Sequence, residues 1–197
     1  MSSEVTRAPD RIAPATSRLG ILFLCTGNAT RSVIAAAALQ RALPTVAIEG
    51  AGTLSIEGLP LGWRTRAALE AVDLDVDRHR SRQVTGGDLD RATLVVGLAP
   101  EHVAWVRREH PPAASRTATL KRLCRDLPGL DGDLEQRLAA LDLSTVALEP
   151  WEEVADPAGR EVEEFVACAH EITSLVNQLA PILAAAESAR PDEPRGS

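Results

Sequence analysis

Aromatic side chains are scarce in this chain, which has three tryptophans, two phenylalanines and no tyrosine. Lysine is nearly absent too, since Lys121 is the only one among 21 basic residues. The net charge is −7, whereas proteins that bind nucleic acid backbones present strongly basic surfaces. The composition therefore argues against a nucleic acid partner. The arginines are interspersed with acids, which is typical of a solvated surface.

Cysteine is rare as well, and Cys25, Cys124 and Cys168 form an odd number without framework spacing. Such a set does not predict a disulfide scaffold, and free thiols are typical of a reducing compartment. No run approaches the ~18 apolar residues of a membrane span. The apolar run at residues 19–24 is shorter than the core of a secretory signal. We expect a cytoplasmic protein that does not associate with membranes.

The remaining composition is that of one globular domain, because 45% of the residues are hydrophobic and 25% are charged. Residues 1–18 and 185–197 mix proline, arginine, serine and acids without periodicity. They are predicted to be disordered tails around one domain at residues 19–184. Within it, residues 125–149 contain two proline- or aspartate-glycine turns and are interpreted as a partly helical insertion.

Short apolar runs alternate with helical patterns along this domain. Four runs have the composition of strands: residues 19–24, 45–49, 93–98 and 117–120. Five stretches have helical spacing: residues 32–43, 63–72, 100–108, 133–141 and 161–183. The alternation predicts an α/β fold of three layers, with helices on both faces of a four-stranded parallel sheet. Ligands of such sheets bind at the carboxyl ends of the strands.

The sequence Cys-Thr-Gly-Asn-Ala-Thr-Arg-Ser at residues 25–32 directly follows the first predicted strand. Phosphoryl transfer to a thiol requires a thiolate, a cradle for the phosphate oxygens and a proton for the leaving group. A thiol at a helix N-terminus beside an arginine ionises more readily than a free one. Arg31 adds a planar fork that can hold two phosphate oxygens. The segment therefore predicts a phosphate-binding loop with Cys25 as nucleophile.

The other loop residues have supporting roles in this interpretation. Gly27 is expected to allow a close backbone approach or a positive φ angle. Asn28 tolerates left-handed geometry, and its amide can tie the loop together. The hydroxyl of Ser32 is placed to donate to the thiolate. The loop is completed by Thr26, Ala29 and Thr30.

The cysteine loop is a specific signal for phosphate binding only when its residues are taken together. A cysteine with an arginine six positions later is weak evidence alone, and Gly27, Asn28 and Ser32 make the pattern specific. The plain alternative is that Cys25 is a buried, inert thiol at a strand end.

Asp156 is the candidate acid. Pro157 biases it toward an extended conformation, so that its carboxylate lies on a loop ahead of a helix. A general acid near the thiolate contributes on the order of 10²–10⁴ in rate. The alternative for Asp156 is an ordinary helix N-cap.

The pattern Cys-x-Gly-Asn-x-x-Arg-Ser after an N-terminal apolar strand resembles the low-molecular-weight protein tyrosine phosphatases. The resemblance continues at residues 50–53, 79–83, 119–121 and 156–159, and thus spans most of residues 19–183.

The resemblance implies Cys25 as the nucleophile of a phosphocysteine mechanism and Arg31 as the group that binds the phosphoryl oxygens. It implies Asp156 as general acid and later base, and His79 as a support of the loop asparagine. It also implies a phosphorylated protein as substrate, and no metal or other cofactor.

The substrate is the open point, and phosphotyrosine is the expectation by resemblance. The aromatic residues that usually flank its ring are missing: Ile56 follows the Ala-Gly-Thr segment, and Ala158 and Gly159 follow Asp-Pro. The alternative is a protein-arginine phosphatase, because the small Ala29 and the glycine after Asp-Pro resemble that branch of the family.

Two other classes of function are compatible with the loop. Arsenate reduction on the same fold needs two further cysteines close together, whereas Cys124 and Cys168 lie in separate helical stretches. A non-catalytic phosphate-binding regulator is suggested by three departures from the family: Val33 and Gly50 stand where proline and serine are usual, and Ala158 stands where tyrosine is common. Pure binding would require neither the thiol nor Asp156. The sequence gives no indication of oligomeric state.

Overall fold

The computed structural model describes residues 19–188. Residues 1–18 and 189–197, which belong to the predicted tails, lie outside the described residues. The described chain forms a four-stranded, all-parallel sheet in the order β2-β1-β3-β4. The strands are β1 (Gly20–Cys25), β2 (Ala47–Gly52), β3 (Leu94–Gly97) and β4 (Thr117–Thr119). The predicted α/β fold with a four-stranded parallel sheet is confirmed.

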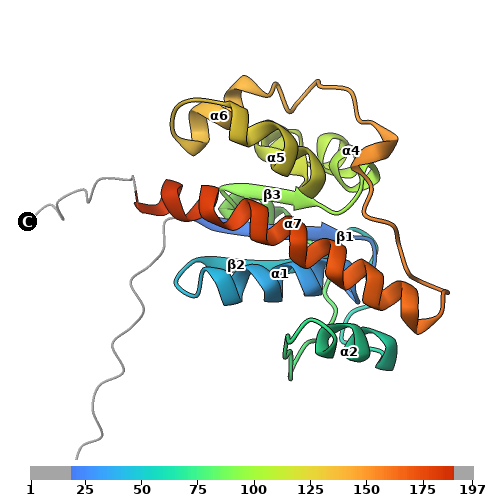
Figure 1. Ribbon diagram of the computed structural model, residues 1–197. Helices are drawn as coiled ribbons and strands as arrows, with labels where there is room; N and C mark the ends of the chain where they lie inside the picture. Colours follow the sequence, from blue (N-terminus) through green and yellow to red (C-terminus); the bar gives the residue numbers. More distant parts are fainter. Residues whose placement is uncertain (1–18, 189–197) are drawn as a thin grey trace, which may run out of the picture.

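Helices cover both faces of this sheet (Figure 1). Within residues 19–188 the α-helices are α1 (Arg31–Ala42), α2 (Trp63–Glu70), α3 (Gly86–Arg91), α4 (Pro100–Glu109), α5 (Leu120–Asp126), α6 (Leu134–Ala140) and α7 (Val162–Ser188). The long helix α7 lies across one face of the sheet, in contact with α1, α2 and α5. It runs past the expected domain end at residue 184.

The central strand β1 divides the core into two halves. Ile21, Phe23 and Cys25 belong to the larger cluster, which contains α1 and α7. Leu22 and Leu24 belong to a smaller cluster on the α3 and α4 side. Successive side chains of a strand point to opposite faces, so a strand covered on both sides is apolar at every position. Burying each large apolar side chain stabilises the fold by about 1.5–3 kcal/mol.

The second strand was predicted to stop at Glu49, and that boundary is wrong. β2 continues through Gly50, Ala51 and Gly52, and Gly52 is paired with Cys25. Glycine is a poor strand former, but here the neighbouring chain leaves no room for a side chain. A Cβ atom on Gly52 would lie 2.5 Å from the carbonyl oxygen of Thr26.

Helices α3 and α5 were not predicted, because both are too short to show a clear period. α3 begins at two glycines, and its start is fixed by a capping box in which Thr85 and Asp88 bind each other's backbone N–H groups. α5 begins where the Thr119 hydroxyl accepts a hydrogen bond from the Arg122 N–H.

Residues 125–149 are tied into the main core. α6 starts at a capping box between Asp133 and Gln136. Leu134, Leu138 and Leu143 are buried in the larger hydrophobic cluster. The segment is therefore packed against the domain, and its status as an insertion stays a prediction.

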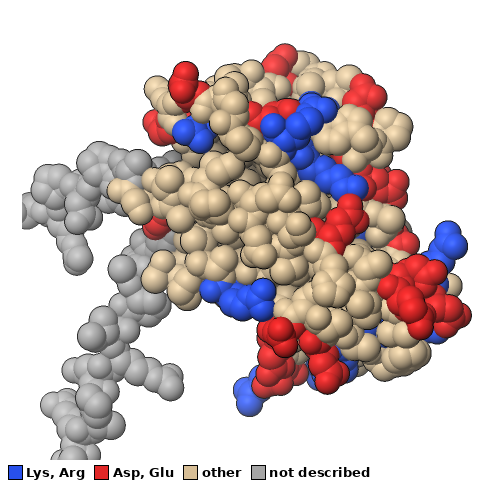
Figure 2. Space-filling model, viewed as in Figure 1, with Lys and Arg blue, Asp and Glu red and all other residues tan. Residues whose placement is uncertain are grey.

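Charges of both signs are scattered over the face shown in Figure 2, with no continuous basic stripe on it. In the part of the chain that the structure describes, no helix has the length and apolar character needed to cross a bilayer.

Replacing Gly52 by alanine tests the close packing at the end of β2. We expect Gly52→Ala to lower the free energy of unfolding by about 1–3 kcal/mol, because the new methyl group meets the Thr26 backbone. Urea unfolding measures the loss. Gly27→Ala is the matched control, because a Cβ at Gly27 meets nothing within 4 Å. Equal stabilities of the two variants would contradict the packing argument.

Candidate active site

The loop of residues 25–32 leaves the carboxyl end of β1, where parallel α/β sheets place their ligands. The chain that follows β2 holds its first two residues: the N–H of Thr53 donates to the Cys25 carbonyl, and that of Leu54 donates to the Thr26 carbonyl, both at 2.9 Å. Gln83 braces this second chain from behind, since its amide binds the Thr53 carbonyl and the Ser55 N–H. The backbone on either side of the thiol is therefore fixed before any ligand arrives.

Cys25 is buried, and its sulfur lies at one end of a chain of hydrogen bonds that runs through Ser32 to Asn28. Its Sγ is 3.0 Å from the Ser32 Oγ, which accepts a hydrogen bond from the Asn28 side-chain amide, also at 3.0 Å. The amide orientation is determined by Arg82, whose backbone N–H must face the Asn28 Oδ1 at 3.0 Å. Because Ser32 receives a hydrogen from Asn28, its own hydroxyl hydrogen is free to donate to Cys25.

Asn28 carries the turn of the loop. It is completely buried and has a φ of 49°, in the left-handed region that asparagine enters more readily than most residues. The positive φ expected for Gly27 is therefore wrong, because the left-handed residue is Asn28. Space beside Gly27 is open, so no protein contact requires a glycine there.

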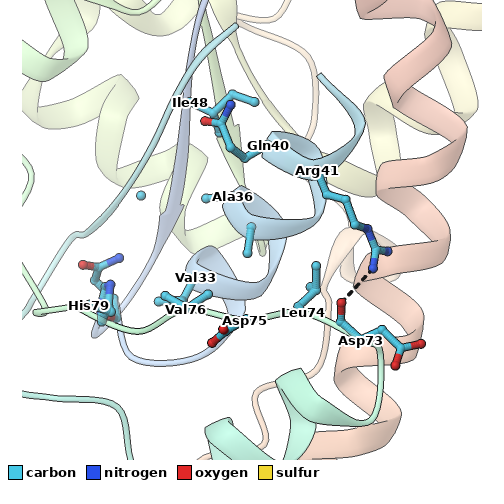
Figure 3. Close-up of a pocket in the computed structure, with 13 residues that line it drawn as sticks. Val33, Ala36, Gln40, Arg41, Ile48, Asp73, Leu74, Asp75, Val76 and His79 are labelled. Carbon is cyan, nitrogen blue, oxygen red and sulfur yellow. Dashed lines mark hydrogen bonds between the residues drawn. The ribbon is translucent and has the colours of Figure 1, made fainter. Parts of the chain in front are cut away.

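His79 supports this turn from outside. Its Nε2–H donates to the Asn28 carbonyl at 2.7 Å. Burial lowers the pKa of His79, while the bond to Asn28 opposes that shift. A cavity of about 520 Å³ extends from His79 along α1 and β2 to Arg41 and Asp73 (Figure 3). It leaves the ring of His79 half-buried.

The N-terminus of α1 points its first N–H groups toward the loop, and no side chain caps it. Thr30 is the N-cap residue, but its hydroxyl lies 2.8 Å from the Thr65 hydroxyl instead. Thr65 in turn donates to the Ala29 carbonyl at 3.1 Å. The unbonded N–H groups of a helix N-terminus attract anions. Thr65 thus keeps the cap residue away from the place where a phosphate would bind.

Arg31 and Asp156 meet across the site, although 125 positions separate them. The Arg31 guanidinium is 2% exposed, donates to the Val154 carbonyl at 3.1 Å and lies 2.5 Å from the Asp156 carboxylate. The Asp156 side chain is 42% exposed, and its other oxygen accepts from the Ala158 N–H. The carboxylate therefore stands at the mouth of the loop, next to the arginine.

Two contacts of the loop had no signal in the sequence. The Thr26 Oγ1 lies 3.2 Å from the Nε2 of His102, a fully buried residue of α4. The Arg82 side chain binds Asp88, Glu49 and the Gly50 carbonyl while its backbone holds Asn28. An isolated histidine in a helix, or an arginine in a charged segment, has no pattern that distinguishes it from surface. These roles depend on the tertiary fold.

The segment that follows β2 is hydrogen-bonded to the loop through the Leu54 N–H and carries two exposed aliphatic side chains. Leu54 is 77% exposed and Ile56 is 71% exposed on the segment that follows β2. Trp63, at the start of α2, is also exposed, and the Arg64 guanidinium lies 4.7 Å above its ring. One face of this tryptophan is therefore already occupied.

The other two cysteines lie in helices, Cys124 in α5 and Cys168 in α7. All three cysteines are free. Cys124 donates to the Leu175 carbonyl, and burial raises its pKa to about 11. Burial raises the pKa of Cys168 to about 12. Both are packed thiols of low reactivity. Among residues 19–188, no group of three or more His, Cys, Asp or Glu side chains is arranged to hold a metal ion.

Comparisons with known proteins agree with this geometry. The family model for low molecular weight phosphotyrosine protein phosphatase matches residues 20–137. The chain is 31% identical over 161 residues to a protein-arginine-phosphatase of Geobacillus stearothermophilus, covering 81% of this chain and 93% of that protein. It is 31% identical over 116 residues to a probable low molecular weight protein-tyrosine-phosphatase, EpsP, of Ralstonia solanacearum, covering 59% of this chain and 72% of that one.

Solved structures of phosphatases superpose on the described chain. The YwlE arginine phosphatase from Geobacillus stearothermophilus superposes with a TM-score of 0.70 at 28% identity, over 89% of this chain and 99% of that one. A low molecular weight protein tyrosine phosphatase from T. tengcongensis superposes with a TM-score of 0.65 at 26% identity, over 83% and 98% of the two chains.

The buried His102 predicts a specific pH dependence of stability. Burial, together with the nearby charge of Arg31, lowers the pKa of His102 from 6.5 to about 3. Between these values the unfolded chain binds a proton that the folded chain does not, so stability falls as the pH falls below about 6.5. Above that pH both states are neutral and the contribution vanishes. As the pH falls from 6.5 toward 3, we expect the free energy of unfolding of wild type to fall by up to about 1.4 kcal/mol per pH unit more than that of His102→Gln.

Urea unfolding of both proteins between pH 4 and 8 measures the difference, since every other titrating group is shared. Parallel stability curves would mean that His102 has the same pKa in the folded and the unfolded protein and would contradict the expectation.

Proposed function

This chain belongs to the low molecular weight phosphotyrosine protein phosphatase family, and on that premise we propose that it removes phosphate from arginine residues of proteins. The reaction would proceed through a phosphocysteine on Cys25. The observation that carries the choice of arginine is the similarity to a protein-arginine-phosphatase over most of both chains. Tyrosine phosphatases match as well, so phosphotyrosine is the second candidate.

In the first step the Cys25 thiolate attacks phosphorus. The phosphoryl oxygens accept hydrogen bonds from the N–H groups at the start of α1 and from the Arg31 guanidinium. The bond between phosphorus and the arginine nitrogen breaks, and its electron pair stays on that nitrogen. Asp156, which takes up a proton once the phosphoryl group displaces it from Arg31, delivers that proton there, so that the arginine leaves with its ordinary guanidinium cation restored. Ser32, which Asn28 holds in place, is the hydrogen-bond partner of the sulfur.

In the second step water attacks phosphorus from the side that the guanidine has left. The Asp156 carboxylate accepts a proton from this water. The sulfur–phosphorus bond breaks, the thiolate leaves with the electron pair, and inorganic phosphate is released. Ser32 can donate to the departing sulfur, because Asn28 already supplies a hydrogen to its oxygen.

The mouth of the site supports a non-aromatic substrate. Ala29 is the exposed residue of the loop and adds only a methyl group to the mouth. Ile56 gives no aromatic surface to stack on, and a pair of stacked rings would be worth about 0.5–1.5 kcal/mol beyond burial. An extended guanidine group needs width and hydrogen-bond acceptors more than a stacking wall. Asp156 carries oxygens of this kind, which Arg31 and the Ala158 N–H engage in the structure until the phosphoryl group takes over Arg31.

A panel of phosphopeptides tests the proposal directly. We expect kcat/KM to be at least tenfold higher for a phosphoarginine peptide than for the matched phosphotyrosine peptide, and p-nitrophenyl phosphate to be hydrolysed as well. Asp156→Asn should lower kcat by about 10²–10⁴ on phosphoarginine and by less on p-nitrophenyl phosphate. The reason is that p-nitrophenolate leaves without a proton, whereas the guanidine nitrogen needs one.

Cys25→Ser is the control for the nucleophile and should be inactive on all three substrates. A wild type no faster than Cys25→Ser would overturn the enzymatic proposal. A tenfold preference for phosphotyrosine would replace arginine with tyrosine and leave the mechanism in place.

Ala29→Ile tests the width of the mouth. A branched side chain there narrows the entrance and adds an apolar wall, so it should lower kcat/KM on phosphoarginine about tenfold without lowering that on phosphotyrosine. The ratio of the two kcat/KM values is the measurement, and Ala29→Ser, which keeps the residue small, is the control. An unchanged ratio would remove Ala29 from the basis of specificity.

A further inference from the structure

We propose that His102 is a positioning residue, which holds the Thr26 side chain and thereby fixes the peptide that follows Cys25 in the phosphate loop. The proposal rests on the proposed role of Cys25 but not on the identity of the substrate. It gives a task to a buried polar side chain that no step of the reaction uses.

The first support is the contact itself. His102 is 0% exposed, and its Nε2 lies 3.2 Å from the Thr26 Oγ1, across 76 positions of sequence. The backbone of Thr26 is held on another side, where its carbonyl accepts from the Leu54 N–H. Thr26 is therefore held at its carbonyl by the chain after β2 and at its hydroxyl by α4. A residue bound at both places leaves little freedom to Cys25 before it.

The second support is the platform on which His102 stands. Its Cβ packs against Gly97 at the end of β3. A side chain at Gly97 would crowd it, because a Cβ added there would lie only 3.2 Å from the Cβ of His102. The next residue, Leu98, donates to the Leu24 carbonyl and accepts from the Val154 N–H. Leu24 precedes the nucleophile, and the Val154 carbonyl holds the Arg31 guanidinium. The platform thus fixes both ends of the catalytic loop, and His102 adds a side-chain link to its middle.

The third support is the unfavourable state of the second ring nitrogen. The Nδ1 of His102 is buried without a hydrogen-bond partner among the described residues. An apolar side chain at this position would avoid that cost, so the imidazole has to be explained by what Nε2 binds. The tautomer with the hydrogen on Nε2 leaves Nδ1 as a bare acceptor, and buried acceptors are left unpaired more often than N–H groups.

The charge of the ring fits the same role. Burial lowers the pKa of His102, and the positive charge of the nearby Arg31 guanidinium lowers it further, so both favour the neutral ring. A neutral donor can hold Thr26 without competing with Arg31 for the phosphoryl oxygens. Lysine or arginine at this position would add such a competitor.

A double-mutant cycle on p-nitrophenyl phosphate tests the proposal. We expect His102→Phe and Thr26→Val each to lower kcat about tenfold with a smaller change in KM, because a loosened loop misplaces the reacting sulfur. The double variant should be no slower than either single one, since both remove the same link. His102→Gln and Thr26→Ser, which keep a hydrogen-bonding group, should recover most of the rate. His170→Gln, on the exposed face of α7, should equal wild type.

A second measurement reads the loop without turnover. Iodoacetate should alkylate Cys25 at pH 7, and inorganic phosphate should protect the thiol. We expect both the alkylation rate and the degree of protection to differ from wild type, and to differ by the same amount in His102→Phe and in Thr26→Val. If His102→Phe does not fold, the Thr26 variants carry the test, because Thr26 is half-exposed and valine has its shape.

Independent effects that multiply in the double variant would overturn the proposal. So would a Thr26→Val variant with wild-type turnover and alkylation. Loss of the enzymatic proposal would instead show as wild type no faster than Cys25→Ser, while the alkylation rates would still report on His102.

Discussion

The left-handed backbone at Asn28 is the constraint on which the site depends. It reverses the chain between the end of β1 and the start of α1, so that the thiol and the helix N-terminus face the same small volume. The conformation is costly for a residue with a side chain, and it persists because Arg82, His79 and Ser32 each bind a different atom of Asn28. These three residues come from two separate parts of the chain. The active loop is thus as stable as the packing between β2, α1 and the segment at residues 79–83.

The elements that could be predicted from the sequence are those with a local signature. β1 is apolar at each position because both its faces are covered, and α7 has a long amphipathic period. The loop residues Cys25, Arg31 and Ser32 could be identified because they occur together with Gly27 and Asn28 directly after an apolar strand. Asp156 was identified as a residue but not as a neighbour of Arg31, because a contact across 125 positions leaves no trace in composition.

Other features were hidden for physical reasons. The end of β2 resembled a turn because it contains two glycines, whereas Gly52 faces the Thr26 carbonyl and Gly50 faces Asn28 and Ser32, so that a side chain at either position would crowd the loop. Gly27 and Asn28 were both candidates for the unusual φ, and the surrounding hydrogen bonds place it on Asn28. His102 looked like any helical histidine. In each case a tertiary contact overrode the local preference, and only the folded chain brings the partners together.

The ion pair between Arg31 and Asp156 has a consequence for which ligands can enter. In the structure the Arg31 guanidinium is already paired with an anion, the Asp156 carboxylate, which belongs to the same chain. A singly charged carboxylate arriving from solution would exchange one such contact for an equal one and gain little. A phosphoryl group has more oxygens, which can use the guanidinium and the open N-terminus of α1 together. The pair therefore favours anions with several oxygens, such as a phosphoryl group, over single carboxylates, and it leaves the Asp156 side chain next to any group that displaces it from Arg31.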